Sequence, residues 1–303
     1  MIRFLVLLLP VLVFAGVEEW KLFDEPKKFK KVQFLDAKVL KFDRIGKERF
    51  YGISALDYDR QTKTLYMLND RSRLFRFRFE VKDDKIKTLK PINSCRLRKT
   101  NGKYFFLWQS DSEGISKRGD DFFVSFEGQY PRIKKFNKDC RQIGQAYLYK
   151  KLKNYRNYQS KNRALESLEY VRGYGLLTSP EKSLKKQKKG FRGIYNYKGQ
   201  VCRFRVDDGL SVVDYESDGK GNLIALFRKL DVLHMGFVVS LKRIKLQRGE
   251  CKVEELATLS SMGLDNIDNF EGITKVGKNL YIMISDDNDR FFEETLLVLF
   301  RVL

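Results

Sequence analysis

The sequence predicts an all-β protein that forms a β-propeller of five or six blades in a single domain. Three observations lead to this prediction: strand-type alternation of apolar and polar residues, weak helical periodicity, and a unit of roughly 50 residues that recurs along the chain. A sheet in such a repeat cannot bury both of its faces alone, so neighbouring sheets are expected to stack around an axis. A β-sandwich is the competing fold, but it would not require equal units.

The first 15 residues resemble a secretory signal peptide. A short basic start is followed by an apolar run over residues 4–14, and Val13 and Ala15 are small enough for signal peptidase. The run is shorter than the roughly 20 apolar residues that span a bilayer, which favours cleavage after Ala15 over an uncleaved anchor. No later stretch reaches transmembrane length. We therefore expect a flexible leader at residues 16–31, a propeller domain at residues 32–303, and a periplasmic or secreted location.

The charge balance points to anionic partners. The 303 residues include 60 Lys and Arg against 39 Asp and Glu, a net charge of +21, and 43% are hydrophobic, which excludes wholesale disorder. Export makes nucleic acid an unexpected partner, and no nucleic-acid motif is present. The expected partners are a small phosphorylated or ester substrate and anionic components of the cell envelope. A Lys-rich surface that merely reflects the source proteome is the alternative.

Four cysteines are compatible with two disulfides in an exported protein, namely Cys95, Cys140, Cys202 and Cys251. The sequence does not choose among their three possible pairings, and four buried free thiols are the alternative. None of the four has the close spacing of a zinc site.

The repeat is visible as strands that follow one another at similar intervals. Five first strands carry the landmarks Tyr51, Glu113, Glu166, Asp214 and Glu271. Second strands are expected at residues 65–70, 122–127, 176–178, 223–228 and 280–286, and third strands at 74–79, 132–136, 191–197, 241–246 and 296–302. Glycines and polar residues at 119–120, 219–222 and 277–279 predict hairpin turns.

Two segments fall outside the five units. Residues 32–42 predict an extra strand, which either closes the ring by pairing with the last unit or belongs to a sixth blade. Residues 142–167 have the weakest strand pattern, and 147–162 are expected to form a loop or short helix.

Acidic residues recur at the start of the first strand in four of the five units. Starts of strands and ends of their antiparallel neighbours meet at the same edge, so we expect these acids to converge at one mouth of the ring with polar residues from the second strands. Crowded carboxylates repel one another, and Ca²⁺ or Mg²⁺ with oxygen ligands would relieve this repulsion. The alternative is a scaffold role in which the acids accept backbone N–H groups at blade turns.

These considerations define candidate site residues for a metal-dependent hydrolase. The catalytic candidates are Glu113, Glu166 and Glu271; the metal candidates are Glu127, Asp214, Asp286 and Asp287; and the phosphate-binding candidates are Arg71 and Arg228. The one histidine, His234, lies in neither a histidine-phosphatase motif nor a G-x-S-x-G context, and it is expected to be a loop or packing residue.

The ordered motifs resemble the phytase-like family, described as having the esterase-like activity of phytase. They comprise residues 52–56, Asp111-Ser112-Glu113-Gly114-Ile115, residues 164–168, residues 223–228, and Asn269-Phe270-Glu271-Gly272-Ile273 with residues 285–288; residues 295–301 resemble the C-terminal strand of the family. Tyr51 stands where other units have an acid, and Ser167 stands where two units have glycine. The resemblance implies an exported, mostly bacterial β-propeller that hydrolyses phosphoesters or esters. The alternative is a non-catalytic exported propeller that binds an anionic ligand or a protein partner.

Overall fold

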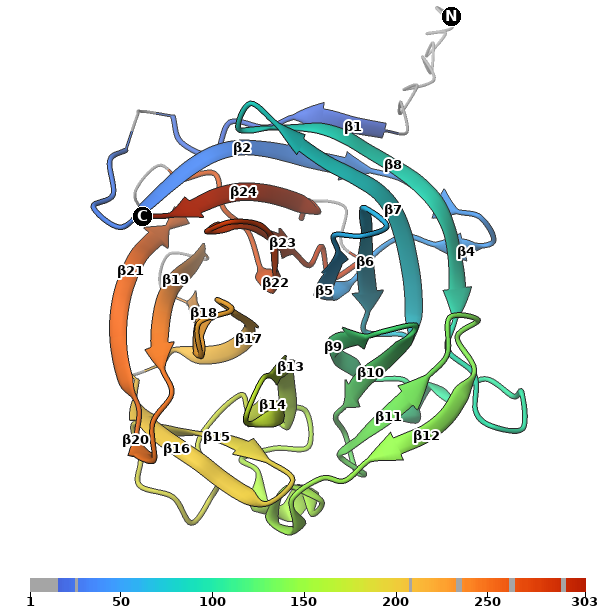
Figure 1. The fold of residues 1–303 in the computed structure, drawn as a ribbon, viewed down its shortest axis with the longest axis vertical. Coiled ribbons are helices and arrows are strands. Elements are labelled where there is room, and N and C mark those ends of the chain that lie inside the picture. Colours follow the sequence, from blue (N-terminus) through green and yellow to red (C-terminus); the bar gives the residue numbers. More distant parts are fainter. Residues whose placement is uncertain (1–15, 25–26, 207–208, 233–235, 262–264, 290–292) are drawn as a thin grey trace, which may run out of the picture.

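The protein is a β-propeller, as the sequence predicts, and it has five blades (Figure 1). The computed structural model describes residues 16–24, 27–206, 209–232, 236–261, 265–289 and 293–303. The predicted signal peptide and His234 lie outside these residues. In each blade the first strand lies innermost, and the five inner strands contact one another in a closed ring. We call the end of the ring at which the inner strands begin the mouth.

The blades are antiparallel sheets built from consecutive strands. Blade 1 contains β5 (Ile53–Asp59), β6 (Thr64–Asn69), β7 (Arg73–Lys82) and β8 (Lys85–Arg96). Blade 2 contains β9 (Ser112–Arg118), β10 (Asp121–Phe126), β11 (Arg132–Phe136) and β12 (Gln142–Ala146). Blade 3 contains β13 (Leu165–Val171), β14 (Gly175–Pro180), β15 (Phe191–Asn196) and β16 (Gly199–Arg205), with the short β20 (Gly249–Glu250) pairing in parallel at its edge.

Blade 4 contains β17 (Ser211–Ser217), β18 (Asn222–Asp231), β19 (Gly236–Lys245) and β21 (Lys252–Ser260). Blade 5 contains β22 (Phe270–Gly277), β23 (Leu280–Ser285) and β24 (Leu296–Val302), completed by β2 (Val32–Lys41) and β1 (Gly16–Glu19) from the other end of the chain. A separate hairpin joins β3 (Arg44–Ile45) to β4 (Glu48–Arg49).

Closure of the ring depends on the pairing of β2 with β24. Their antiparallel register runs from Val32 opposite Val302 to Val39 opposite Leu296. The strand predicted over residues 32–42 therefore pairs with the last unit and does not form a sixth blade. The segment before it differs from the flexible leader that the sequence predicts, because β1 pairs with β2 and Leu22 is buried.

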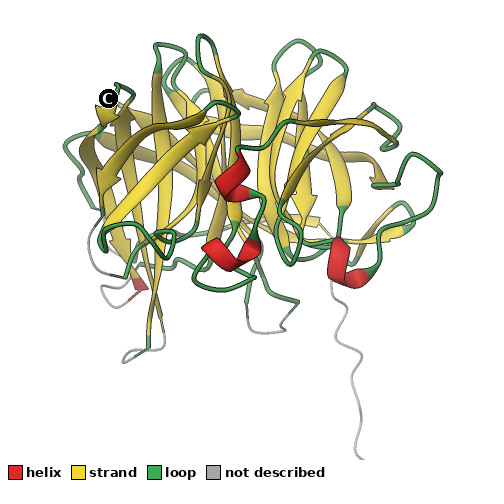
Figure 2. Ribbon diagram, turned by 90° about the horizontal axis from the view of Figure 1, so that it is seen from below, coloured by secondary structure: helices red, strands yellow, loops and turns green. Residues whose placement is uncertain are grey.

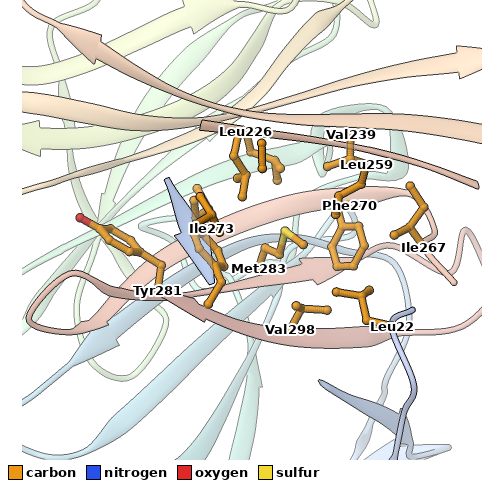
Figure 3. Close-up of a cluster of buried hydrophobic side chains, with 14 of the residues drawn as sticks. Leu22, Leu226, Val239, Leu259, Ile267, Phe270, Ile273, Tyr281, Met283 and Val298 are labelled. Atoms are coloured by element: carbon orange, nitrogen blue, oxygen red, sulfur yellow. The ribbon is translucent and has the colours of Figure 1, made fainter. Parts of the chain in front are cut away.

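Each blade buries both of its faces against its neighbours. The buried apolar side chains form five clusters, one for each of the five contacts between adjacent blades. Figure 3 shows the cluster between blades 4 and 5, where Leu226 and Val239 meet Phe270, Ile273 and Met283. This arrangement explains why second strands such as β6 read as nearly continuous apolar runs.

Two disulfides link neighbouring blades. Cys95 pairs with Cys140, connecting the end of blade 1 to blade 2, and Cys202 pairs with Cys251, connecting blade 3 to blade 4. All four cysteines are therefore paired. Each disulfide closes a loop of more than 40 residues, so both are expected to restrict the unfolded chain substantially.

Helical structure is sparse in the described parts of the chain. It comprises the 3₁₀ turns η1 (Leu107–Gln109), η2 (Lys150–Leu152) and η3 (Tyr155–Asn157), the last two within the segment predicted to be a loop or short helix. None of the helices in the described residues is long and apolar enough to cross a membrane.

Two glycines in blade 2 provide a matched test of inter-blade packing. A Cβ atom on Gly114 would lie 2.7 Å from Ser125 Oγ and 2.9 Å from the backbone N of Leu168 in blade 3, whereas on Gly144 it would meet only Lys135 Cβ, at 3.9 Å. We expect Gly114→Ala to lower the free energy of unfolding by about 1–3 kcal/mol because the blades must move apart. Gly144→Ala should be neutral or stabilising, since it only restricts the unfolded chain. Urea denaturation of both variants checks this, and equal midpoints would contradict it.

Candidate functional site

Each inner strand begins with a β-bulge at the mouth. The bulged residues are Ser54, Glu113, Glu166, Val213 and Glu271. A bulge places one extra residue on the inner strand and re-aims its side chain. The predicted landmarks thus coincide with the bulge in the second, third and fifth units. In the other two units they do not, because Tyr51 precedes the bulge and Asp214 follows it.

Acids from the inner strands and from the ends of second strands converge at this mouth, as expected from antiparallel pairing. We call the group the acidic mouth; it comprises Asp70, Asp111, Glu113, Glu127, Glu166, Glu181, Glu271 and Asp286. Glu113 illustrates the convergence. Burial raises its pKa well above the usual range, and the carboxylates of Glu127, Glu166 and Glu271, from blades 2, 3 and 5, raise it further.

Three of these acids form a compact triad on blade 2. Carboxylate oxygens of Asp111, Glu113 and Glu127 all lie within 4.8 Å of one another. Glu127 Oε2 accepts a hydrogen bond from the backbone N of Ala164 (2.9 Å), which holds it in place. Burial, followed by the charge of Asp111, raises the pKa of Glu127 to about 8, and burial also raises the pKa of Asp111. Hard oxygen ligands at this spacing suit a divalent cation.

Asp111 was missed as a candidate although it belongs to the same motif as Glu113. Residues two apart on extended backbone point to the same side, so the i, i+2 spacing of two acids was the available signal. The structure adds that Asp111 pairs across an isolated β-bridge with Arg71, at the end of the neighbouring second strand.

Two arginines from second-strand ends lie among the acids, but their partners differ. Arg228 Nη1 donates to both the Glu271 carboxylate and the Asn269 side-chain oxygen, so it neutralises a charge within the mouth. Arg71 Nε lies 3.3 Å from Asp70 Oδ2 and its side chain is 41% exposed. Arg71 is therefore the better placed of the two to meet a substrate.

The acids on blade 5 divide into one that faces the mouth and one that supports it. Burial raises the pKa of Asp286 to about 9, and the charge of Glu271 raises it further. Asp287 instead accepts hydrogen bonds from Gly52 N (2.9 Å) and Thr295 Oγ1 (3.0 Å), which tie blade 5 to the entrance of blade 1. Asp287 thus has the partners of a scaffold residue.

Deeper along the axis, a second ring of polar residues lies three positions after each bulge: Asp57, Ser116, Glu169, Glu216 and Thr274. Its members link adjacent inner strands, since Lys117 N donates to Asp57 Oδ2 (2.5 Å), Ser116 Oγ to Glu169 (3.4 Å) and Thr274 Oγ1 to Glu216 (3.1 Å). Burial raises the pKa of Asp57 to about 7 and that of Glu216 to about 8.

Asp214 belongs with this deeper ring and not with the acidic mouth. Its oxygens accept hydrogen bonds from the backbone N atoms of Tyr215 (2.8 Å) and Ile273 (2.9 Å). The acids that act on its pKa are Glu216 and Asp57, after the dominant effect of burial. The arrangement corresponds to the scaffold alternative, in which the acids accept backbone N–H groups, although here the bond to Ile273 joins two blades and does not lie at a blade turn.

An open cleft of about 720 Å³ adjoins the triad. Its lining residues are Arg71, Leu107, Trp108, Asp111, Gly128, Gln129, Tyr155, Lys161 and Asn162. The cleft therefore combines one carboxylate of the triad with two cationic side chains and an aromatic wall. A pocket of this volume accommodates a small-molecule substrate.

Comparison with known proteins supports a family assignment. A family model described as "Esterase-like activity of phytase" matches residues 48–289. No curated protein matches the sequence.

Among solved structures, the PQQ-bound aldose sugar dehydrogenase from Streptomyces coelicolor is 10% identical, covers 90% of this chain and 99% of its own, and has a TM-score of 0.48. U3-55K is 6% identical with a TM-score of 0.44, covering 88% of this chain and 98% of its own. The likeness to these structures carries no information on activity. The family model spans well over half of the sequence, and the chain therefore belongs to the Phytase-like family.

Proposed function

We propose that this protein is an exported hydrolase that uses a divalent cation, Ca²⁺ or Mg²⁺, to cleave phosphoesters or esters at its acidic mouth. The observation that carries the proposal is the triad of Asp111, Glu113 and Glu127, whose oxygens lie within 4.8 Å beside an open cleft. The family description, esterase-like activity of phytase, supports the same class of reaction.

The residues of the mouth fit a cation. Burial raises the pKa values of all three triad carboxyls, and their mutual repulsion contributes to the shifts of Glu113 and Glu127. The ionised carboxylates are therefore disfavoured unless a positive charge lies beside them. Close by, Asp70 Oδ1 is buried and has no hydrogen-bond partner among the described residues. A bound divalent cation would supply this charge and would polarise a phosphoryl or carbonyl oxygen.

The remaining mouth residues have separate roles in this proposal. Arg71 binds the phosphate of a substrate in the cleft, where a guanidinium offers paired donors. Burial and the charge of Glu127 raise the pKa of Glu166 well above its usual range, which suits this carboxyl to donate a proton to the leaving group. Arg228 holds Glu271 in position across the mouth.

Hydrolysis of a panel of substrates tests the proposal. Protein beginning at Gly16 is assayed on p-nitrophenyl phosphate, bis-p-nitrophenyl phosphate, phytate and a carboxyl ester, with Ca²⁺, Mg²⁺ or a chelator. We expect turnover that requires a cation and falls by about 100-fold or more in Glu113→Gln and Glu166→Gln.

Glu250→Gln is the matched control, since Glu250 is exposed at the outer edge of blade 3. Absence of turnover on every substrate, or equal turnover in Glu113→Gln and the unmodified protein, would refute the enzymatic role. Cation binding without turnover would favour the non-catalytic alternative.

Export is part of the proposal and rests on two observations. The N-terminal residues have the pattern of a signal peptide, and both disulfides are of a kind that persists in oxidising compartments. We expect protein recovered from the periplasm or medium to begin at Gly16, which N-terminal sequencing checks. Recovery of only the full-length chain from the cytoplasm would contradict export.

A further inference from the structure

A cluster of large apolar side chains lies exposed beside the mouth. We call it the aromatic rim; it comprises Tyr104, Phe106, Leu107, Trp108 and Tyr130, which are between 53% and 71% exposed. Three of its rings adjoin one another, because the rings of Phe106 and Trp108 are parallel with centroids 6.3 Å apart and those of Trp108 and Tyr130 are 6.4 Å apart. Contiguous apolar patches on a soluble protein mark interaction sites, whereas isolated exposed residues do not.

The rim belongs to the face of the ring that carries the mouth. Residues 97–111 connect blade 1 to β9 at the mouth, and Leu107 and Trp108 line the same cleft as Asp111. A second apolar projection lies on this face, because β18 runs past Arg228 at the mouth to the exposed Leu230 and Val232. In Figure 2 this face points downward, away from the C-terminus at the upper edge.

Cations surround the rim. Lys99 Nζ lies 4.7 Å from the ring centre of Phe106, and the Arg96 guanidinium lies 4.8 Å from that of Tyr104. A neighbouring pocket of about 420 Å³ is lined by Arg163, Lys182, Lys185, Lys189 and Arg192, and the described residues that line it include no acid. Glu113 and Glu127, two acids of the mouth, are buried and present little charge at this surface.

This combination matches the chemistry of an anionic bilayer. Trp, Tyr and Phe with flanking Lys and Arg are typical of the membrane–water interface, where rings lie at headgroup level and cations meet lipid phosphates. The buried centre of a protein–protein interface is typically apolar and depleted of Lys. Here, in contrast, Lys99 stacks directly on the rim, which favours a lipid surface over a protein partner.

We propose that the mouth face docks onto an anionic phospholipid surface through the aromatic rim and its basic surroundings. Docking brings lipid headgroups to the cleft beside Asp111, so that a lipid phosphodiester becomes accessible to the acidic mouth. Docking itself requires no catalysis, and it is measured with chelator present, so its outcome does not depend on the proposed hydrolysis.

The chain offers a direct spectroscopic probe of docking. It contains two tryptophans, and Trp20→Phe leaves Trp108 as the only one. We expect Trp108 emission to shift to shorter wavelength with mixed phosphatidylcholine–phosphatidylglycerol vesicles, and to be quenched by brominated lipid, but to change little with phosphatidylcholine alone. Should Trp20→Phe unfold the protein, loss of brominated-lipid quenching in Trp108→Phe, compared with the unmodified chain, gives the same information. Unchanged emission with anionic vesicles would overturn the proposal.

Cosedimentation of variants with the same vesicles identifies the surface. The backbone N of Lys99 donates to the carbonyl O of Lys103 (2.8 Å), so the two lysines lie side by side at the rim. We expect Leu107→Ser/Trp108→Ser, and separately Lys99→Glu/Lys103→Glu, to reduce partitioning by about 10-fold or more. Tyr197→Ser is the control, because Tyr197 is also exposed but follows β15 at the opposite end of the ring. Full retention of binding in both double variants, or equal loss in Tyr197→Ser, would overturn the proposal.

Discussion

In the presence of a chelator the protein is expected to be less stable at pH 8 than at pH 5, and a divalent cation is expected to reverse the difference. Burial raises the pKa of Asp70 to about 6, of Asp57 to about 7, and of Glu127 and Glu216 to about 8. In the unfolded chain such groups titrate near pH 4. Between pH 4 and pH 8 the folded state therefore binds more protons, and stability falls as pH rises through that interval.

The expected effect is large. A shift of about three units, as for Asp57, corresponds to about 4 kcal/mol, although coupling among the acids makes their contributions less than additive. Thermal unfolding should therefore shift by on the order of 10 °C between the two pH values. Because cations compete with protons for the mouth carboxyls, Ca²⁺ or Mg²⁺ should raise the melting temperature more at pH 8 than at pH 5.

Comparison of Glu127→Gln with Asp57→Asn separates the contribution of the acidic mouth to the pH dependence of stability from that of the deeper ring. The neutral amide should stabilise the protein at pH 8 in chelator and abolish most of the cation effect, whereas Asp57→Asn should reduce the pH slope and preserve the cation effect. A melting temperature that is constant or rises from pH 5 to pH 8 in chelator would contradict the prediction. The net charge of +21 cannot produce the expected fall, because loss of positive charge with rising pH would relieve repulsion.

Truncation of the chain before residue 43 is expected to prevent stable folding. It removes β2, which pairs with β24 and buries Val32, Ala37, Val39 and Leu40. Burying a Val or Leu side chain contributes about 1.5–3 kcal/mol, so the loss approaches the 5–15 kcal/mol by which a typical protein is stable. The truncation also exposes the edge of β24, which invites aggregation.

A shorter truncation provides the control. A chain beginning at Trp20 lacks only β1, which lies at the outer edge of blade 5 and is partly exposed, so it should fold with a modest loss of stability. Circular dichroism and gel filtration distinguish the two chains. Addition of a synthetic peptide spanning residues 30–42 should restore folding of the chain that begins at residue 43. Cooperative unfolding of that chain without the peptide would show that closure by β2 is dispensable.

Much of the fold was predictable because propeller blades repeat local patterns. Alternation such as that of residues 74–79 identified β7, glycines such as Gly119 marked hairpin turns, and the repeat length indicated stacked blades. The number of blades was not predictable, since residues 32–42 had the same pattern whether they paired with β24 or began a sixth sheet. Pairing between residues so distant in sequence depends on how many sheets complete the circle.

The location of the candidate site was predictable from the sequence, but the exact set of residues that form it was not. Acids at strand starts were correctly expected to meet at one mouth, where Glu113, Glu166 and Glu271 lie close together. Asp214 was placed in the same register, but the bulge at Val213 shifts it by one residue and turns it toward backbone N–H groups. A one-residue change in register moves a side chain to the other face of a strand, and a bulge leaves no distinct signature in the sequence.

The amino-acid order alone was sufficient for the class of fold, the recurrence of acids and the presence of four cysteines, because these follow from periodicity and composition within one blade. Tertiary structure was needed to choose the disulfide pairs, to close five blades through β2, to bring Asp111 beside Glu113 and Glu127, and to divide the acids between mouth and deeper ring. The physical reason is that the charge state and chemistry of a carboxyl group depend on burial and on its neighbours in space. Those neighbours come from blades that are distant in sequence and adjacent only in the closed ring.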